Sequence, residues 1–366
     1  MTDKKSGIYV HIPFCKSKCK YCAFVSTPDF SLQKKYVDAL LREIEQSRFR
    51  GTACDTVYIG GGTPSCLFEG GISSILNALY ADFAIENDAE ITVECNPESV
   101  NERFIAECLS LGVNRVSMGL QCSDDKVLRN IGRIHDFNCF LSAIRLLSKS
   151  FDNISSDLIL GLPWQSTSDI ERSINVLSDY CSHVSVYALA VEDGTPLGAS
   201  GYSVDDDIVA DMYDRAVDML RERGYSRYEV SNFARDGKQS RHNLKYWRNM
   251  PYLGFGVAAH GYDGVDKRYA HGNDILEYIK DPTPKYYELS YKDRFNEYVM
   301  LALRTERGID LEDFEQTFGR VFFDVKGDET SRLSKSGYIV ADDRFLRIND
   351  KYMFVMNGII EALMID

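Results

Sequence analysis

The sequence predicts an α/β protein in which a partial (β/α)6 barrel precedes a small C-terminal α+β domain resembling a winged helix. In the first half of the chain, six apolar, β-rich runs alternate with amphipathic helical patterns. The repeat is about 30 residues per unit, which is typical of βαβ units in a parallel sheet. Near the end of the chain, two helical patterns precede a hairpin-like run, an order compatible with a winged helix.

The barrel is predicted from six strands and the five helices between them. The strands are expected at Ile8–Phe14, Thr56–Ile59, Ala89–Glu94, Val113–Met118, Ile154–Leu160 and Val184–Ala190. The helices are expected at Leu32–Ser47, Gly71–Tyr80, Asn101–Leu111, Phe137–Ser148 and Thr167–Tyr180. A complete eight-fold barrel usually needs about 250 residues, so six units predict an open barrel with its site at the carboxyl ends of the strands.

The pattern changes after residue 200. An acidic amphipathic helix is expected at Asp205–Arg223, and an irregular stretch rich in Tyr, Trp, Gly and His follows from Tyr225 to about Tyr269. The last elements are two helices, a hairpin and a final helix, expected at Phe295–Arg304, at Leu311–Phe318, around Gly337–Ile348 and after it. The predicted parts are a barrel, a barrel extension and a C-terminal domain, at 1–200, 201–285 and 286–366.

The composition is that of an ordinary globular protein. Of 366 residues, 44% are hydrophobic and 27% are charged, which excludes disordered, collagen-like and disulfide-miniprotein classes. The net charge of −13 gives the protein a negative overall electrostatic field, which argues against nucleic-acid binding through that field. No apolar run approaches the ~18 residues of a membrane span. The N-terminal MTDKKSGIYVHIPFC lacks the apolar stretch of a signal peptide, so we expect a cytoplasmic protein.

Three of the ten cysteines, Cys15, Cys19 and Cys22, form a C-x3-C-x2-C pattern after the first expected strand. Three thiolates on one loop can hold three irons of a four-iron cluster and leave the fourth iron open to a second molecule. A zinc site would need a fourth ligand, such as His11, and uncomplexed thiols on this cationic loop would be reactive. The other cysteines match no ligand spacing and are expected to be buried thiols: Cys54, Cys66, Cys95, Cys108, Cys122, Cys139 and Cys181.

With this triplet the sequence resembles the radical S-adenosylmethionine (SAM) superfamily. In that family the open iron binds the amino and carboxylate groups of SAM, and the reduced cluster cleaves SAM to a 5′-deoxyadenosyl radical. The run Gly60–Pro64 follows the second expected strand and is similar to the family's GGTP motif, which meets the SAM amino group. Its glycines allow backbone amides to approach a ligand closely.

The resemblance implies further contacts to the cluster and SAM. Glu94 suits the ribose hydroxyls, Arg133 suits the SAM carboxylate, Tyr9 and Tyr21 flank the cluster loop, and Ala188 offers a backbone contact to adenine. Taken singly, each polar residue of this kind is more often a cap or a surface group. The implied set is Tyr9, Tyr21, Gly61, Gly62, Thr63, Glu94, Gln121, Arg133, Asp157 and Ala188.

Further motifs narrow the resemblance to the radical SAM group of oxygen-independent coproporphyrinogen III dehydrogenases and HemW heme chaperones, connected with porphyrin biosynthesis. They are Y-V-H-I-P-F-C at Tyr9–Cys15, G-G-G-T-P at Gly60–Pro64, G-L-P at Gly161–Pro163 and E-D-G-T-P-L at Glu192–Leu197. The dehydrogenases resemble C-x3-C-x2-C-x-C, whereas this chain has Phe24 at the fourth position. They also have a longer segment before the cysteines.

The motif H-N-x-x-Y-W of HemW proteins, associated with heme binding, matches this chain at His242, Asn243, Tyr246 and Trp247. An imidazole can ligate heme iron, and the two aromatic rings offer flat apolar faces to a porphyrin. We therefore expect these four residues to bind heme, with His242 as the axial contact. The alternative is a buried His–aromatic cluster that pins the loop; other nearby imidazoles are those of His260 and His271.

Together, these resemblances imply a heme chaperone that holds heme, a [4Fe-4S] cluster and SAM, and passes heme to a recipient hemoprotein. They assign no catalytic residue and leave open whether SAM is cleaved. A homodimer and a transient contact with a membrane hemoprotein also stay open. The alternative function is the dehydrogenase, which converts two propionates to vinyl groups. A second alternative is radical chemistry on an unrelated small molecule.

Overall fold

The structure, a computed structural model, describes residues 4–365. The strands are β1 Ser6–Ile12, β2 Ala53–Gly61, β3 Ala84–Cys95, β4 Arg115–Gln121, β5 Ile154–Leu160, β6 His183–Ala188, β7 Ser226–Arg227, β8 Asn232–Ala234, β9 Tyr252–Phe255, β10 His260–Tyr262, β11 Lys267–Ala270, β12 Lys285–Glu288, β13 Ile309–Asp310, β14 Ile339–Ala341 and β15 Phe345–Ile348. The α-helices are α1 Gln33–Glu45, α2 Gly71–Asp82, α3 Glu102–Ser110, α4 Asp125–Asn130, α5 Phe137–Leu147, α6 Thr167–Tyr180, α7 Pro196–Ala199, α8 Asp206–Glu222, α9 Arg241–Trp247, α10 Ile275–Lys280, α11 Tyr291–Ala302, α12 Leu311–Phe318, α13 Phe322–Lys335 and α14 Asn357–Leu363. Short 3-10 turns lie at Phe30–Leu32, Pro64–Cys66, Pro97–Ser99 and Asp350–Val355.

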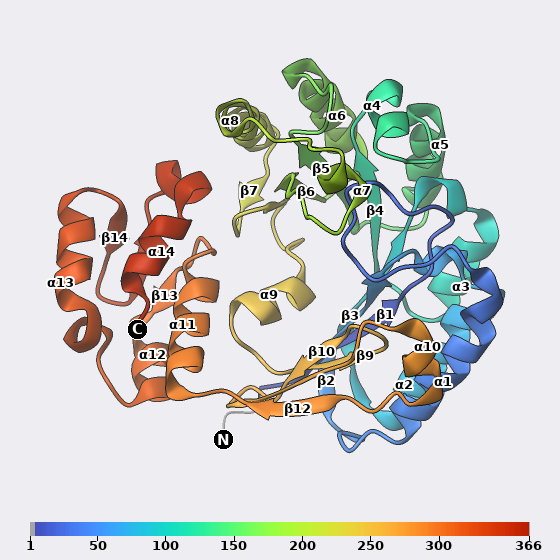
Figure 1. The fold of residues 1–366 in the computed structure, drawn as a ribbon, viewed down its shortest axis with the longest axis horizontal. Coiled ribbons are helices and arrows are strands. Elements are labelled where there is room, and N and C mark those ends of the chain that lie inside the picture. Colours follow the sequence, from blue (N-terminus) through green and yellow to red (C-terminus); the bar gives the residue numbers. More distant parts are fainter. Residues whose placement is uncertain (1–3, 366) are drawn as a thin grey trace.

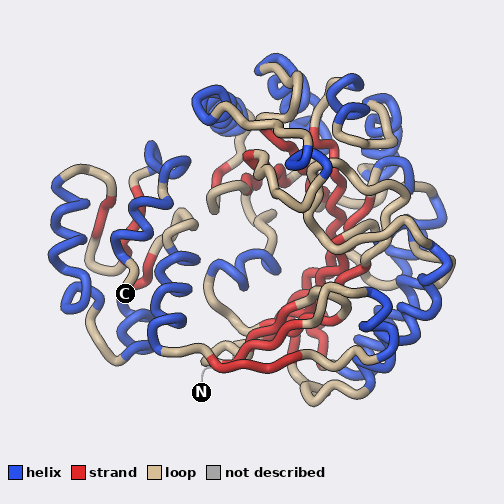
Figure 2. The backbone as a smooth tube through the Cα atoms, viewed as in Figure 1, coloured by secondary structure: helices blue, strands red, loops and turns tan. Residues whose placement is uncertain are grey.

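A curved twelve-stranded sheet forms the larger part of the molecule, in the order β12-β11-β10-β9-β1-β2-β3-β4-β5-β6-β8-β7. The strands from β9 through β1 to β6 pair in parallel, and the strands at both edges pair antiparallel. Figure 1 shows helices α1–α6 and α8 around the outer side of this sheet. In Figure 2 the strands form an arc between those helices and the interior of the barrel. The predicted α/β class with an open barrel is confirmed.

The two faces of the parallel strands differ in polarity because side chains alternate along a strand. On β1, Ile8, Val10 and Ile12 are fully buried in the hydrophobic core. Tyr9 and His11 lie between them in the sequence and form a hydrogen bond with each other. The helices pack against the apolar face of the sheet, and the polar face places functional groups inside the barrel.

All six predicted barrel strands form, and β5 and α6 have the predicted bounds. The first strand ends at Ile12, just before Pro13, which has no N–H to donate to a sheet. The fourth runs over Arg115–Gln121 instead of Val113–Met118, because a turn with Gly112 at φ 76° separates it from α3.

The predicted irregular stretch from Tyr225 to Tyr269 is wrong, since it contains strands β7–β11 and helix α9. These strands are two to four residues long, too short to show a period in the sequence. They extend both edges of the sheet, and β9 pairs directly with β1. Helix α13 was also not predicted.

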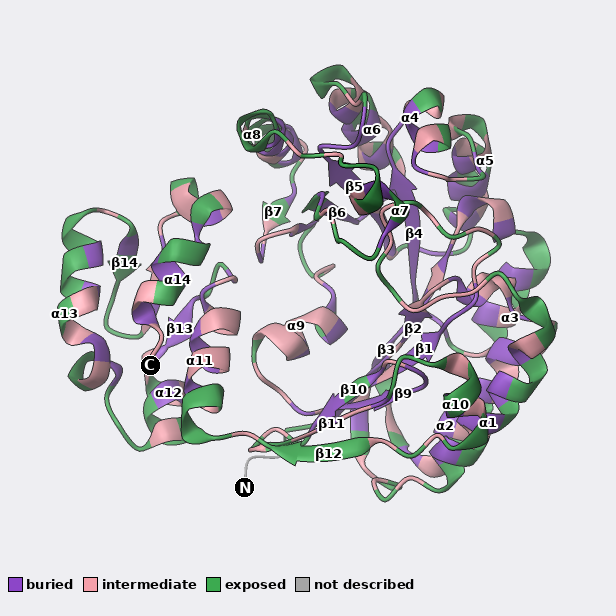
Figure 3. Cartoon of the chain, in the orientation of Figure 1, coloured by how far each residue is buried: buried purple, intermediate pink, exposed green. Residues whose placement is uncertain are grey.

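The C-terminal domain has its own small sheet, β13-β15-β14, and its own core. Its three fully buried phenylalanines, Phe295, Phe314 and Phe322, contact one another edge to face or stacked. Backbone hydrogen bonds from Val230 to Arg304 and from Glu306 to Tyr228 join this domain to the barrel. Figure 3 shows α9 with its mixture of buried and partly exposed residues on the side of the barrel that faces this domain.

None of the helices in the described residues is long and apolar enough to cross a membrane.

Candidate functional site

A cavity of about 480 Å³ lies at the carboxyl ends of the parallel strands. Its walls come from the loop after β1 and from the ends of β2 to β6. The structure brings together twelve residues that the sequence singled out: Cys15, Cys19, Cys22, Tyr21, Gly61, Gly62, Thr63, Glu94, Gln121, Arg133, Asp157 and Ala188. They meet because parallel strands place their carboxyl ends at one edge of the sheet.

The cysteine loop has hydrogen-bond donors aimed at its sulfur atoms. Cys15 Sγ accepts from the hydroxyl of Thr63 at 3.4 Å, and Cys19 Sγ accepts from Arg133 at 3.7 Å. Burial raises the pKa of the Cys15 and Cys22 thiols. Coordination to a metal deprotonates a thiol outright. Three thiols with cationic and hydroxyl donors therefore fit a thiolate-bound iron–sulfur cluster.

A single metal ion needs a different arrangement of ligands. Among residues 4–365, no three His, Cys, Asp or Glu side chains are grouped so that they could hold one metal ion. In a four-iron cluster, each thiolate binds its own iron atom.

The glycine run at the end of β2 lies directly against β1. Gly61 has φ 98°, and a Cβ there would lie 2.3 Å from the His11 ring. A Cβ at Gly62 would lie 2.5 Å from the carbonyl oxygen of Ile12. Only glycine fits both positions, because one needs the left-handed backbone region and the other meets backbone atoms. The loop thereby presents its backbone to the cavity.

Glu94 is held as a hydrogen-bond acceptor at the end of β3. Its Oε1 accepts from the Tyr58 hydroxyl at 2.5 Å, and its Oε2 accepts from the Gly61 N–H at 2.9 Å. Desolvation by burial, with a contribution from the Asp157 charge, raises the pKa of Glu94 to about 7. Both carboxylates line the same cavity. Gln121, also in the wall, has φ 71°, a strained conformation for a residue other than glycine.

Arg133 is oriented by two further acceptors. Its Nη2 donates to Asn96 Oδ1 at 3.0 Å and to the Gly119 carbonyl at 2.9 Å. The Asn96 amide in turn donates to the Thr63 hydroxyl at 3.0 Å. Sequence reasoning missed Asn96, although its place after the third strand, before Pro97, was a usable signal. The cavity therefore has a connected polar wall that ends on the cysteine sulfurs.

Tyr9 does not line this cavity. Its hydroxyl is hydrogen bonded to His11 Nδ1 at 2.9 Å, and its ring stacks on Tyr58 with centroids 6.2 Å apart. The other ring nitrogen of His11 is hydrogen bonded to the Val25 carbonyl at 2.9 Å. Both residues therefore lie inside the barrel and hold the loop that follows the cysteines.

The H-N-x-x-Y-W motif forms helix α9, away from the strand-end cavity. His242 is 1% exposed, and its Nδ1 and Nε2 are hydrogen bonded to the hydroxyls of Thr56 at 2.9 Å and Tyr246 at 2.7 Å. Desolvation, and then the charges of Lys245 and Arg115, lowers the pKa of His242 to about 3. The imidazole is neutral, and axial ligation would require one of its hydrogen bonds to be replaced.

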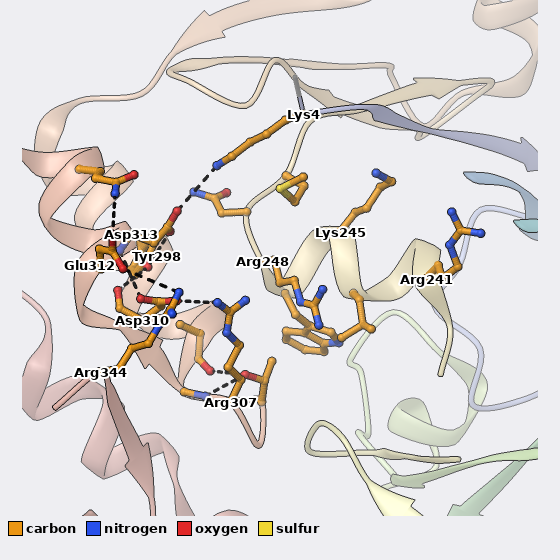
Figure 4. Close-up of a pocket in the computed structure, with 18 of the residues that line it drawn as sticks. Lys4, Arg241, Lys245, Arg248, Tyr298, Arg307, Asp310, Glu312, Asp313 and Arg344 are labelled. Atoms are coloured by element: carbon orange, nitrogen blue, oxygen red, sulfur yellow. Dashed lines mark hydrogen bonds and ion pairs between the residues drawn. The ribbon is translucent and has the colours of Figure 1, made fainter. Parts of the chain in front are cut away.

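The other residues named for heme lie around this helix. Asn243 is half-buried in α9, and its N–H donates to the hydroxyl of the capping Ser240 at 3.2 Å. Trp247 lines a second cavity, of about 470 Å³, between α9 and the C-terminal domain (Figure 4). His260 is exposed on β10, whereas His271 is buried and paired with Glu43 at 2.8 Å.

Comparisons with known proteins cover the whole chain. The family model of the radical SAM superfamily matches residues 9–177, and the HemN C-terminal domain model matches residues 289–355. The heme chaperone HemW of Lactococcus lactis subsp. lactis is 33% identical over 382 residues, covering 100% of this chain and 99% of that protein. The HemW of Bacillus subtilis is 34% identical, covering 85% of this chain and 86% of that protein.

Another relative and a solved structure are also similar to this chain over almost its whole length. The mitochondrial radical S-adenosyl methionine domain-containing protein 1 of Bos taurus is 31% identical, covering 99% of this chain and 88% of that protein. The structure of coproporphyrinogen III oxidase (HemN) from Escherichia coli has a TM-score of 0.85 at 22% identity, covering 99% of this chain and 90% of that one. At 22% identity, the likeness to the HemN structure shows only that the two proteins share a fold. The chain belongs to the HemW heme chaperone family, within the radical SAM superfamily.

Proposed function

We propose that this protein binds heme and delivers it to a recipient hemoprotein, while its strand-end cavity holds a [4Fe-4S] cluster and SAM. The observation that carries this proposal is the similarity to the Lactococcus lactis HemW heme chaperone over the full length of both chains. The recipient is a hemoprotein in the cytoplasm or at a membrane surface. Heme binding is assigned to α9 and its surroundings.

In the strand-end cavity, Cys15, Cys19 and Cys22 would hold the cluster, and Arg133 and Thr63 would stabilise the charge on the sulfurs through the bonds described above. A cluster held by these cysteines would supply an electron to SAM. Glu94 presents a carboxylate that can accept hydrogen bonds from the hydroxyl groups of SAM. The backbone of Gly61 and Gly62, which packs directly on β1 because neither residue has a side chain, lines the same cavity. Bound thus, SAM would be kept at one end of the barrel.

At α9, the aromatic residues and the imidazole have separate roles in the proposal. Trp247 is partly exposed to the second cavity and offers a flat face to the macrocycle. His242 is proposed as the axial contact, with the Tyr246 hydroxyl giving up its bond to Nε2 when iron binds. Because Thr56 would still hold Nδ1, the ring keeps its orientation during the exchange.

The test uses anaerobic protein with a reconstituted cluster. One sample receives heme and then an apo-hemoprotein, and we expect saturable heme binding followed by appearance of the acceptor's holo spectrum. Another receives SAM, a reductant and coproporphyrinogen III, and we expect no decarboxylated product. Absence of heme binding would overturn the proposal. Protoporphyrinogen with matching 5′-deoxyadenosine would identify the dehydrogenase instead, despite Phe24, which is 67% exposed at the cavity.

A further inference from the structure

Helix α9 presents different residues to its two sides. His242 contacts the inner face of the barrel, where it meets Thr56 and Tyr58. Leu244, Trp247 and the capping residue Arg248 line the cavity between α9 and the C-terminal domain. This cavity, called here the α9 cleft, measures about 470 Å³, within the range of about 300–1,000 Å³ found for small-molecule sites. The H-N-x-x-Y-W motif assigns no function to most of the residues in this cleft.

The α9 cleft is positively charged within an acidic protein. Six basic and four acidic side chains line it, whereas the whole chain has a net charge of −13. Every acidic side chain in the lining already has a basic partner. The pairs are Asp55 with Lys245 at 2.6 Å, Asp310 with Arg307 at 2.5 Å and with Arg344 at 3.2 Å, Glu312 with Arg344 at 3.8 Å, and Asp313 with Lys4 at 3.9 Å.

Arg248 is the exception among the basic residues of the cleft. Within residues 4–365, its side chain makes no ion pair and no hydrogen bond. Desolvation, followed by the nearby charge of Arg307, lowers the pKa of Arg248. Figure 4 shows Arg248 projecting from the end of α9 and Arg307 from the C-terminal domain, both at the cleft. Arg307 is already paired with Asp310, whereas Arg248 is exposed at the cleft and is the one basic lining residue without an acidic partner within residues 4–365.

The same wall holds a second group without a partner. The side-chain oxygen of Asn249 is buried and has no hydrogen-bond partner among the described residues. Apolar surface lies beside these polar groups, from Leu244, Trp247, Met250 and Ala302. The Asn249 oxygen can only accept a hydrogen bond and does not favour an anion, whereas the Arg248 guanidinium and the apolar surface suit a ligand with a flat apolar body and an anionic edge.

We propose that the α9 cleft binds the propionate edge of heme, with Arg248 and Arg307 facing the carboxylates and Trp247 contacting the macrocycle. Guanidinium groups suit carboxylates because their N–H groups form paired, charge-assisted hydrogen bonds. The inference rests on the proposed heme binding but not on His242 as the ligand of the iron, because His242 faces the inner side of the barrel and does not line the cleft. It gives the C-terminal domain a role, since Arg307 belongs to that domain.

The test compares heme with heme dimethyl ester, which has the same macrocycle and iron but no carboxylate. Both are titrated spectroscopically into the full-length wild type, Arg248→Gln and Arg307→Gln. Arg320→Gln is the matched control, because Arg320 is exposed and does not line the cleft. We expect the wild type to prefer heme over the ester on the order of ten-fold, and Arg248→Gln to lose that preference while binding the ester as before.

Thermal unfolding separates this role from a structural one. Because Arg248 has no partner in the protein and lies near Arg307, its replacement should leave the unfolding midpoint unchanged or raised. The inference is overturned if the wild type binds both ligands equally, or if Arg248→Gln keeps the preference for heme. If the wild type binds neither ligand, the proposed heme binding fails as well, so the two failures are distinguishable. Arg307→Gln, which also removes a bond to Asp310, should lose the preference for heme as well, and retention of that preference would overturn the assignment of Arg307.

Discussion

The ring of Tyr58 stacks on the imidazole of His242, with the two centroids 5.3 Å apart. The hydroxyl of the same tyrosine donates to Glu94 in the wall of the strand-end cavity. One side chain of β2 therefore contacts both the proposed SAM site and the helix proposed to bind heme. The polar inner face of the barrel is a common support for the two sites.

Removing the Tyr58 hydroxyl should weaken SAM binding near neutral pH. Its hydrogen bond favours the ionised form of Glu94, so Tyr58→Phe should raise the pKa of Glu94 above about 7. The midpoint of SAM binding, titrated in reconstituted protein from pH 6 to 9, should move to higher pH by about one pH unit. Tyr80→Phe, which loses one hydrogen bond far from the cavity, is the control. An unchanged midpoint would mean that SAM binding does not depend on the ionisation of Glu94.

Each thiol of the C-x3-C-x2-C loop should be needed for the cluster. Replacement of Cys15, Cys19 or Cys22 by Ala should abolish incorporation of iron and acid-labile sulfide, since each thiolate binds a separate iron. Cys139→Ala is the matched control, because Cys139, which was expected to be buried, is partly exposed and does not line the cavity. The iron and acid-labile sulfide contents of each variant are measured after anaerobic reconstitution. A full cluster content in any of the three variants would contradict the assignment.

Gly62 should tolerate no side chain. In Gly62→Ala the new Cβ would lie 2.5 Å from the Ile12 carbonyl oxygen, which belongs to the rigid strand β1. We expect the free energy of unfolding to fall by about 1–3 kcal/mol. Gly194→Ala is the control, since nothing lies within 4 Å of its Cβ. Urea unfolding compares the two; equal stability would mean that the loop moves away from β1 without cost.

His242 should make the protein more sensitive to acid. Its pKa is about 3 in the folded state against 6.5 for an unperturbed imidazole, so the unfolded chain binds the proton first as the pH falls. The stability that depends on neutral His242 is fully present above pH 6.5 and decreases toward pH 3. Between pH 6.5 and 5 the loss should be about 2 kcal/mol.

The measurement is urea unfolding of the wild type and His242→Gln at both pH values. The variant lacks the titrating group and should lose about 2 kcal/mol less than the wild type over this interval. Thr56, Tyr58 and Tyr246 face the ring, and the positive charges of Lys245 and Arg115 lie near it. The same pH dependence in both proteins would mean that water reaches the imidazole in the folded state.

The order of the six barrel strands and of helices α1, α2, α3, α5 and α6 between them, the cysteine loop and most of the strand-end cavity were predictable from the sequence. Parallel βα units place every strand's carboxyl end at the same edge, and with the resemblance to the radical SAM superfamily this assigned Glu94, Gln121 and Asp157 to one site without knowledge of distances. The cysteine triplet was also predictable from the sequence, because its three ligands lie within one short loop.

Only the tertiary structure decided the surroundings of α9. Pairing of β9 with β1 brings His242 against Thr56 and Tyr58, residues nearly two hundred positions earlier in the chain. The approach of the C-terminal domain creates the cleft in which Arg248 lies near Arg307. Short strands show no period, and side chains on separate domains share no spacing, so these contacts depend on packing between distant segments.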